Sequence, residues 1–125
     1  MERVGIDTST LIDASKGILQ AAQALRGRKT AIAELVVCEF LQGNLTPQEE
    51  ERFLRQIHPL PAHEFTRKAA RIAAHEHRKA IRKGKTYPAM DLAIAASYLA
   101  AGITTIITRN PKDFEGIEGL SVETY

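Results

Sequence analysis

The stretch Arg3-Val4-Gly5-Ile6-Asp7-Thr8-Ser9-Thr10 decides the fold of this chain. Its first four residues predict a short strand, and the hydroxyl residues after Asp7 are typical of the N-terminus of a helix. A strand that runs directly into a helix places Asp7 at the carboxyl end of the strand. Ligands collect at that edge in open α/β sheets, so Asp7 is the first candidate for a functional residue.

The rest of the chain continues this alternation of strands and helices. Further strands are expected at 30–32 and 105–108 and, at an edge of the sheet, at 121–123; helices are expected at 18–25, 33–42, 46–56, 62–83 and 90–101. Such alternation predicts an α/β fold with a mainly parallel central sheet flanked by helices. A length of 125 residues favours one domain, spanning 1–125.

Composition indicates an ordinary globular protein, with 44% apolar residues and a net charge of +2. Cys38 is the single cysteine, which excludes an intramolecular disulfide and favours a reducing compartment. The N-terminus lacks the apolar segment of a signal peptide, so a cytoplasmic location is expected. The longest uncharged stretch, 92–108, is shorter than the roughly 20 residues of a membrane span, and we expect no membrane association.

Four short acidic motifs lie far apart in the sequence. They are Asp7 within 5–9, Glu39 within 36–40, Asp91 within 90–96 and Asp113 within 108–114. Three of these carboxylates stand against apolar sequence, where an ionised carboxylate is costly unless a cation, a proton or several donors compensate it. Hard divalent cations such as Mg²⁺ prefer oxygen ligands, so carboxylates that converge from distant segments predict a metal site.

The order and spacing of these motifs resemble those of a PIN-domain ribonuclease, most closely a VapC-type toxin of a type II toxin–antitoxin module. The resemblance covers nearly the whole chain and rests on Asp7-Thr8-Ser9 with Leu11-Ile12 just after it, Glu39 in an early helix, Asp91-Leu92-Ala93-Ile94-Ala95-Ala96, and Thr108-Arg109-Asn110-Pro111-Lys112-Asp113-Phe114. It implies a PIN-like fold and an endoribonuclease that depends on Mg²⁺, with Mn²⁺ as a substitute. It also implies an RNA substrate, an antitoxin protein partner and a homodimer.

The resemblance assigns the metal to Asp7, Glu39 and Asp91, and either Asp113 or Asn110 completes the acidic cluster. An amide oxygen coordinates a cation without adding negative charge, so Asn110 would bind a second cation more weakly than a carboxylate. Thr108, at the end of a strand, is expected to orient a carboxylate or a water molecule. Its alternative is an ordinary β-branched strand residue.

Three of the acidic residues also have a structural alternative, which for Asp113 is an exposed turn residue. Asp7 is well placed to cap the following helix. Asp91 lies in the first turn of a helix, where the helix dipole stabilises a carboxylate by roughly 0.3–1 kcal/mol. Glu39 shares its helix with Glu34, about 140° away around the helix axis, so helical geometry admits only one of them to a shared site and does not choose between them. The resemblance selects Glu39.

The helix expected at 62–83 separates an apolar face from a basic one. Its apolar face contains Phe65, Ala69, Ile72, Ala73 and Ala80. The opposite side, within an arc of about 60°, carries four arginines, here called the arginine row: Arg67, Arg71, Arg78 and Arg82. Arginine suits bidentate contact with phosphate, so the row is a candidate contact for RNA, or for an acidic segment of a protein partner.

Two other function classes compete with the nuclease. In a non-catalytic PIN-like module, the acids would act only as caps and the basic helix would bind nucleic acid or protein. Phosphatases that use an aspartate as covalent nucleophile contain an Asp-x-Asp motif. This chain has Ser9 in place of the second aspartate, so a phosphatase with Asp7 as nucleophile is disfavoured. A zinc site is also disfavoured, because His75 and His77 lie about 160° apart on a helix.

Overall fold

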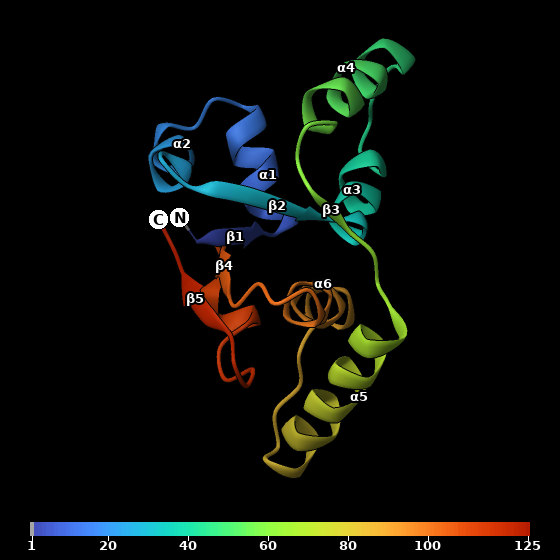
Figure 1. Cartoon of the computed structure of the whole chain (residues 1–125), viewed down its shortest axis with the longest axis vertical. Coiled ribbons are helices and arrows are strands. Elements are labelled where there is room, and N and C mark those ends of the chain that lie inside the picture. Colours follow the sequence, from blue (N-terminus) through green and yellow to red (C-terminus); the bar gives the residue numbers. More distant parts are fainter. Residues whose placement is uncertain (1) are drawn as a thin grey trace.

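The computed structural model of the chain describes residues 2–125, and Figure 1 shows an open sheet with helices on both sides. Met1, which belongs to the expected domain, lies outside the described residues. The strands are β1 (Arg3–Ile6), β2 (Lys29–Ala33), β3 (Ala62–His63), β4 (Thr105–Ile107) and β5 (Ser121–Glu123). The α-helices are α1 (Thr8–Ser15), α2 (Leu19–Leu25), α3 (Glu34–Leu41), α4 (Pro47–Ile57), α5 (Arg67–Arg82) and α6 (Ala89–Ala100), and a short 3-10 helix, η1, spans Pro111–Asp113.

The five strands form one sheet in the order β3-β2-β1-β4-β5, and every neighbouring pair is parallel. The expected α/β fold with a parallel sheet is therefore confirmed. The chain leaves β1 toward β2 on one side, whereas β4 pairs with β1 on the other side. The order in which strands are added to the sheet therefore reverses between β1 and β4. Open α/β sheets bind ligands in the crevice outside the carboxyl ends of the strands at such a point.

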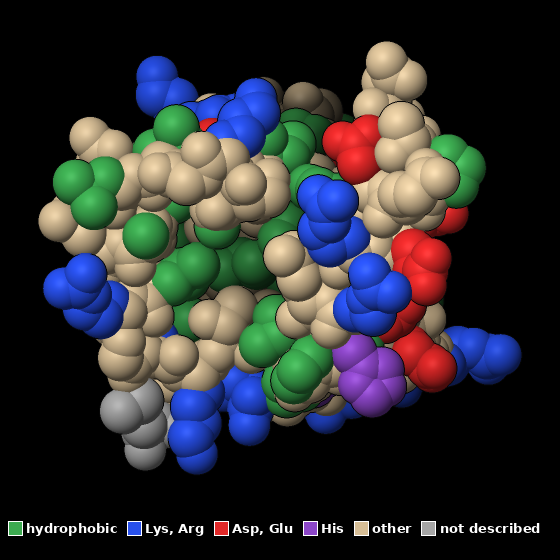
Figure 2. Space-filling view, turned by 90° about the horizontal axis from the view of Figure 1, so that it is seen from above, with side chains coloured by type: hydrophobic (Ala, Val, Ile, Leu, Met, Phe, Trp, Pro, Cys, Tyr) green, Lys and Arg blue, Asp and Glu red, His purple; other side chains and the backbone are tan. Residues whose placement is uncertain are grey.

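The helices cover the sheet in two groups. In Figure 1, α1 and α2 lie above the strands, with α3 and α4 to their right, while α5 and α6 lie below. Helix α5 packs against α6, and α3 contacts α1, α6 and β2. The rings of Phe40 and Phe53 stack at a centroid distance of 4.0 Å and join α3 to α4. Seen from above, in Figure 2, the surface is hollowed at its centre, and apolar side chains form the floor of the hollow.

The core is continuous through the central strands. Val4, Ile6, Ile106 and Ile107 are buried, as are half of the side chains of α6. Parallel strands covered on both faces contain near-continuous apolar runs, as these do. Within residues 2–125, no helix has both the length and the apolar character needed to cross a bilayer.

Gly5 is the glycine that the packing of this core requires. A Cβ atom at position 5 would lie 2.6 Å from the ring of Tyr98, which projects from α6 and is fully buried. The Tyr98 hydroxyl accepts hydrogen bonds from the backbone N–H of Ile6 (3.2 Å) and Ala33 (3.0 Å) and donates one to the carbonyl of Ile6. Burial raises the pKa of Tyr98, which keeps this hydroxyl a proton donor. One hydroxyl thus joins α6 to the end of β1 and the start of α3.

The prediction of one long helix at 62–83 is wrong at its N-terminal end. Ala62–His63 forms the edge strand β3, because the backbone here pairs with β2, starting with a bond from the N–H of Ile32 to the carbonyl of Pro61 (3.0 Å). Helix α5 begins only at Arg67, where the Thr66 side chain caps it. Phe65, expected on its buried face, precedes the helix and is 42% exposed.

Candidate active site

Asp7 lies directly after β1 and is 4% exposed. It caps α1, since its Oδ1 accepts a hydrogen bond from the backbone N–H of Thr10 (3.0 Å). Ser9 Oγ donates to the same carboxylate at 2.8 Å, and Thr108 Oγ1 donates to its other oxygen at 2.6 Å. Hydrogen bonds to a carboxylate are stronger than neutral ones. Asp7 thus has the capping role expected as its structural alternative, and its three hydrogen-bond partners also fix the orientation of its carboxylate at the edge of the sheet.

Thr108 follows β4, the strand beside β1, and its side chain is fully buried. It donates to Asp7, and its oxygen accepts a hydrogen bond from the backbone N–H of Asn110 (2.9 Å). The hydrogen bond expected from this threonine to a carboxylate is present. Thr108 thereby ties the carboxyl ends of β1 and β4 together and fixes the start of the loop that carries Asp113.

Glu39 comes from α3, whose entry point is fixed by the Tyr98 hydroxyl. Its Oε1 accepts a hydrogen bond from Thr8 Oγ1 at 2.5 Å, which places it beside the residue that follows Asp7. Glu34, the alternative on the same helix, is the first residue of α3 and is exposed to solvent. The structure thus brings Glu39, rather than Glu34, toward Asp7.

Asp91 lies in the first turn of α6 and is partly buried. Its pKa is raised from 3.8 to about 6, first by desolvation and then by the negative charges of Asp113, Asp7 and Glu39. A hydrogen bond with the Asp113 carboxyl adds to the rise in pKa. Carboxyl groups from four separate segments therefore come within electrostatic range of one another. We call Asp7, Glu39, Asp91 and Asp113 the acidic cluster.

The acidic cluster suits a hard cation by its donor set, which consists of carboxylate oxygens alone. Desolvation, followed by the charges of three neighbouring carboxylates, raises the pKa of Asp91, and a divalent cation would offset both effects. No three His, Cys, Asp or Glu side chains in residues 2–125 already converge as metal ligands.

The structure separates the two candidates for the fourth acidic position. Asp113, at the end of η1, interacts directly with the carboxyl of Asp91. Asn110 precedes η1, is exposed, and is tied to the site through its backbone N–H rather than its side chain. Both residues line a pocket of about 380 Å³ in the loop after β4. Asp113 is therefore the candidate that adds a carboxylate to the cluster.

Sequence reasoning missed several residues that hold the acidic cluster in place. Ser9 contacts both oxygens of Asp7, and Tyr98 joins three of the elements that carry the acids. Buried Asp13 forms an ion pair with Arg109 (2.7 Å) next to Thr108. The role of Ser9 could have been predicted, because its hydroxyl lies two residues after Asp7 in the first motif. The other contacts depend on packing between distant segments and leave no mark in the local sequence.

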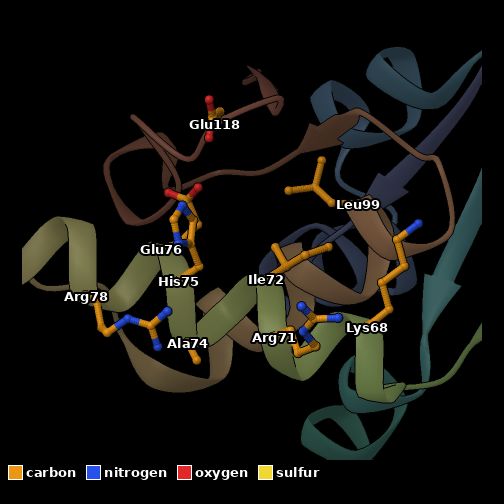
Figure 3. A pocket seen from close by; sticks show the side chains of 9 residues that line it. All are labelled: Lys68, Arg71, Ile72, Ala74, His75, Glu76, Arg78, Leu99 and Glu118. Carbon is orange, nitrogen blue, oxygen red and sulfur yellow. The ribbon is translucent and has the colours of Figure 1, made fainter.

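The arginine row lies away from the acidic cluster. Its four members are exposed on α5. Arg71 and Arg78 line a cavity of about 620 Å³ together with Lys68 and His75 of the same helix. Figure 3 shows this cavity bounded by Leu99 from α6 and by Glu118 from the loop between β4 and β5. None of its lining residues belongs to the acidic cluster, so this cavity and the cluster are separate features of the surface.

Comparisons with known proteins identify the fold. No protein-family model matches the chain, and no curated protein matches its sequence. Among solved structures, VapBC2 from Rickettsia felis bound to a promoter DNA fragment has a TM-score of 0.82 at 20% identity, covering 98% of each chain. DNA-bound VapBC from Salmonella typhimurium gives 0.82 at 22% identity, covering 99% of this chain and 98% of the other. A toxin–antitoxin complex from Klebsiella pneumoniae gives 0.78 at 25% identity, covering 94% of this chain and 95% of the other.

These similarities extend over nearly the whole chain. The chain therefore has the fold of a protein chain found in these toxin–antitoxin complexes, and the single PIN-like domain expected from the sequence is confirmed.

Proposed function

We propose that this chain is a metal-dependent endoribonuclease and the toxin of a type II toxin–antitoxin pair, of the VapC type. The observation that carries the proposal is the acidic cluster at the carboxyl ends of β1 and β4, where Thr108 binds Asp7 and Asp91 has a pKa of about 6. The fold shared with VapBC complexes supports the same function.

Asp7, Glu39 and Asp91 would hold Mg²⁺, or Mn²⁺ in its place, with Asp113 as the fourth carboxylate. When bound, the cation supplies an activated water and stabilises negative charge on the phosphoryl oxygens. Hydrogen bonds from Thr108 and Ser9 hold both oxygens of Asp7 in fixed positions before any substrate arrives. Such preorganisation reduces the rearrangement needed at the moment of reaction.

Two further contacts set the properties of this site. Thr8 Oγ1 donates to Glu39 and keeps that side chain directed toward Asp7. The carboxyl of Asp91 has a pKa of about 6, so near neutral pH it gains or loses a proton readily. Proton release from Asp91 would accompany cation binding, because a carboxylate must be ionised to act as a ligand.

An antitoxin protein is the expected partner, since the structural neighbours are toxin–antitoxin complexes by their own descriptions. The hollow with an apolar floor in Figure 2 supports such a partner, because apolar patches mark protein interaction surfaces. Leu19 in α2 is 61% exposed and Leu54 in α4 is 41% exposed, which adds apolar surface on these helices. RNA as substrate and a homodimer as the working assembly belong to the same proposal.

Calorimetric titration of the purified chain with Mg²⁺ or Mn²⁺, followed by an RNA cleavage assay, tests the function. We expect binding at millimolar concentration or below, and we expect Asp7→Asn and Asp91→Asn each to abolish both binding and cleavage. Glu34→Gln is the matched control, because it removes an exposed carboxylate of α3 outside the cluster. A chain that binds no divalent ion and cleaves no RNA would instead be the non-catalytic binding module.

A further inference from the structure

The loop after β4 forms a pocket that combines cationic and acidic side chains. Its volume is about 380 Å³, and its lining includes Arg109, Asn110, Lys112 and Asp113. Asp113 also interacts with Asp91, so this pocket and the acidic cluster share a residue. Two cationic side chains therefore line a pocket that includes one member of the acidic cluster.

Arg109 is held in place by a network buried beneath it. Its Nη1 donates to Asp13 Oδ1 at 2.7 Å, and Asp13 is 6% exposed. The Tyr125 hydroxyl donates to the other oxygen of Asp13, also at 2.7 Å. Arginine has five N–H donors, so a single hydrogen bond leaves most of them free. The Arg109 side chain is 52% exposed, and its guanidinium is thus both anchored and accessible.

Lys112 has a different role in the pocket. It is exposed, and no ion pair of Lys112 occurs within the described range 2–125. Asp13 neutralises part of the charge of Arg109, whereas the Lys112 ammonium forms no such ion pair in residues 2–125. The pocket therefore offers an anion the Lys112 ammonium and the exposed part of the Arg109 guanidinium, next to the carboxylate of Asp113.

A polyanion that approaches four carboxyl groups is repelled unless cationic groups near the cluster offset that repulsion. Arg109 and Lys112 stand where such groups are needed. Arginine and lysine contacts to phosphate oxygens fix the position of a nucleic acid on a protein. The Asp113 carboxylate repels phosphate, whereas Arg109 and Lys112 attract it.

We propose that this pocket binds a backbone phosphate of single-stranded RNA next to the phosphate that is cleaved, with Arg109 and Lys112 as its ligands and Asp13 as the positioning residue for Arg109. The inference rests on the proposed nuclease function, which it deepens by locating a second substrate contact. It requires no metal, because the phosphate contacts involve side chains of this chain alone.

Binding of a short fluorescein-labelled single-stranded RNA in EDTA, followed by fluorescence anisotropy at several salt concentrations, tests the site without cleavage. The double variant Arg109→Gln/Lys112→Gln should weaken binding and reduce the slope of log K against log salt by about 1.4, since each lost contact to a single strand removes about 0.7. Lys112→Gln alone should remove about 0.7. This single variant keeps the test valid if loss of Arg109 unfolds the chain by leaving Asp13 unpaired.

The matched control is Lys16→Gln/Arg26→Gln, which removes two exposed cations outside the pocket. It should leave the salt slope unchanged. If the wild type binds and cleaves RNA while Lys112→Gln and the double variant keep its salt slope, the phosphate site is refuted and the nuclease function stands. If the wild type neither binds nor cleaves RNA, the proposed function fails, and the phosphate site fails with it.

Discussion

Replacing Asp91 with Asn should stabilise the metal-free protein at alkaline pH. The pKa of Asp91 is raised from 3.8 to about 6 in the folded chain, so folding favours its protonated form. The resulting penalty is absent below about pH 4, grows as the pH rises through the interval between the two pKa values, and is fully present above about pH 6. Asn has nearly the same shape and no charge, so it removes the penalty.

The size of the effect follows from the shift in pKa. At 1.36 kcal/mol per unit, a rise of about two units corresponds to a ceiling of about 3 kcal/mol. Asp91 is only partly buried, so solvent screening lowers this figure, and the loss of a charge from the first turn of α6 lowers it further. We expect Asp91→Asn to raise the free energy of unfolding by about 1–2 kcal/mol at about pH 8.

Urea denaturation in EDTA at about pH 5 and about pH 8 measures this difference. The wild type should lose stability between these two pH values, and the variant should lose less. Addition of millimolar Mg²⁺ should then stabilise the wild type more than the variant, since a ligand stabilises the state that binds it. A variant that is less stable than the wild type at about pH 8 in EDTA would refute the desolvated position of Asp91 beside three other carboxyl groups.

Three further predictions concern packing, site assignment and RNA binding. Gly5→Ala should destabilise the fold by about 1–3 kcal/mol in urea denaturation, because its Cβ would lie 2.6 Å from the Tyr98 ring, and adding Tyr98→Leu should recover part of the loss. Glu39→Gln should reduce the RNA cleavage rate far more than Glu34→Gln, and equal, mild effects would remove Glu39 from the site. Changing the whole arginine row to Gln should lower the salt slope of RNA binding by about 3 without altering metal affinity, and an unchanged slope combined with lost antitoxin binding would assign the row to the protein partner.

Elements whose signals are local were predictable from the sequence. The expected strand Arg3–Ile6 is present with the same bounds, and α4 lies within a residue of the expected range 46–56, its N-terminus fixed by a capping box of Thr46 and Glu49. The edge strand β3 was missed because backbone pairing with β2 creates it, and its two residues show no side-chain alternation. The expected helix was therefore extended across Ala62 and Phe65, where the chain is still running along the sheet.

The same distinction between local signals and distant contacts applies to the candidate site. The acidic residues were found because each stands in a short motif, and the resemblance to PIN-domain ribonucleases assigned them to one metal site. Thr108 was expected to orient a carboxylate or a water molecule, but its partner Asp7, 101 positions away, was not specified, and Tyr98, whose bonds to Ile6 span 92 positions, was missed altogether. Such contacts depend on the packing of α6 and β4 against β1, which a periodicity of apolar residues does not specify.

The separation between Asp7 and Thr108 also bears on how the protein is made. A ribosome releases β1 and Asp7 first, while the Tyr98 hydroxyl and the Thr108 donor emerge about a hundred residues later. A nascent chain that ends before α6 lacks two of the four carboxyl groups as well as both of these supports. Under the proposed function, chains that end before α6 therefore do not cleave the RNA around them, and cleavage becomes possible only once α6 and the loop after β4 have been synthesised.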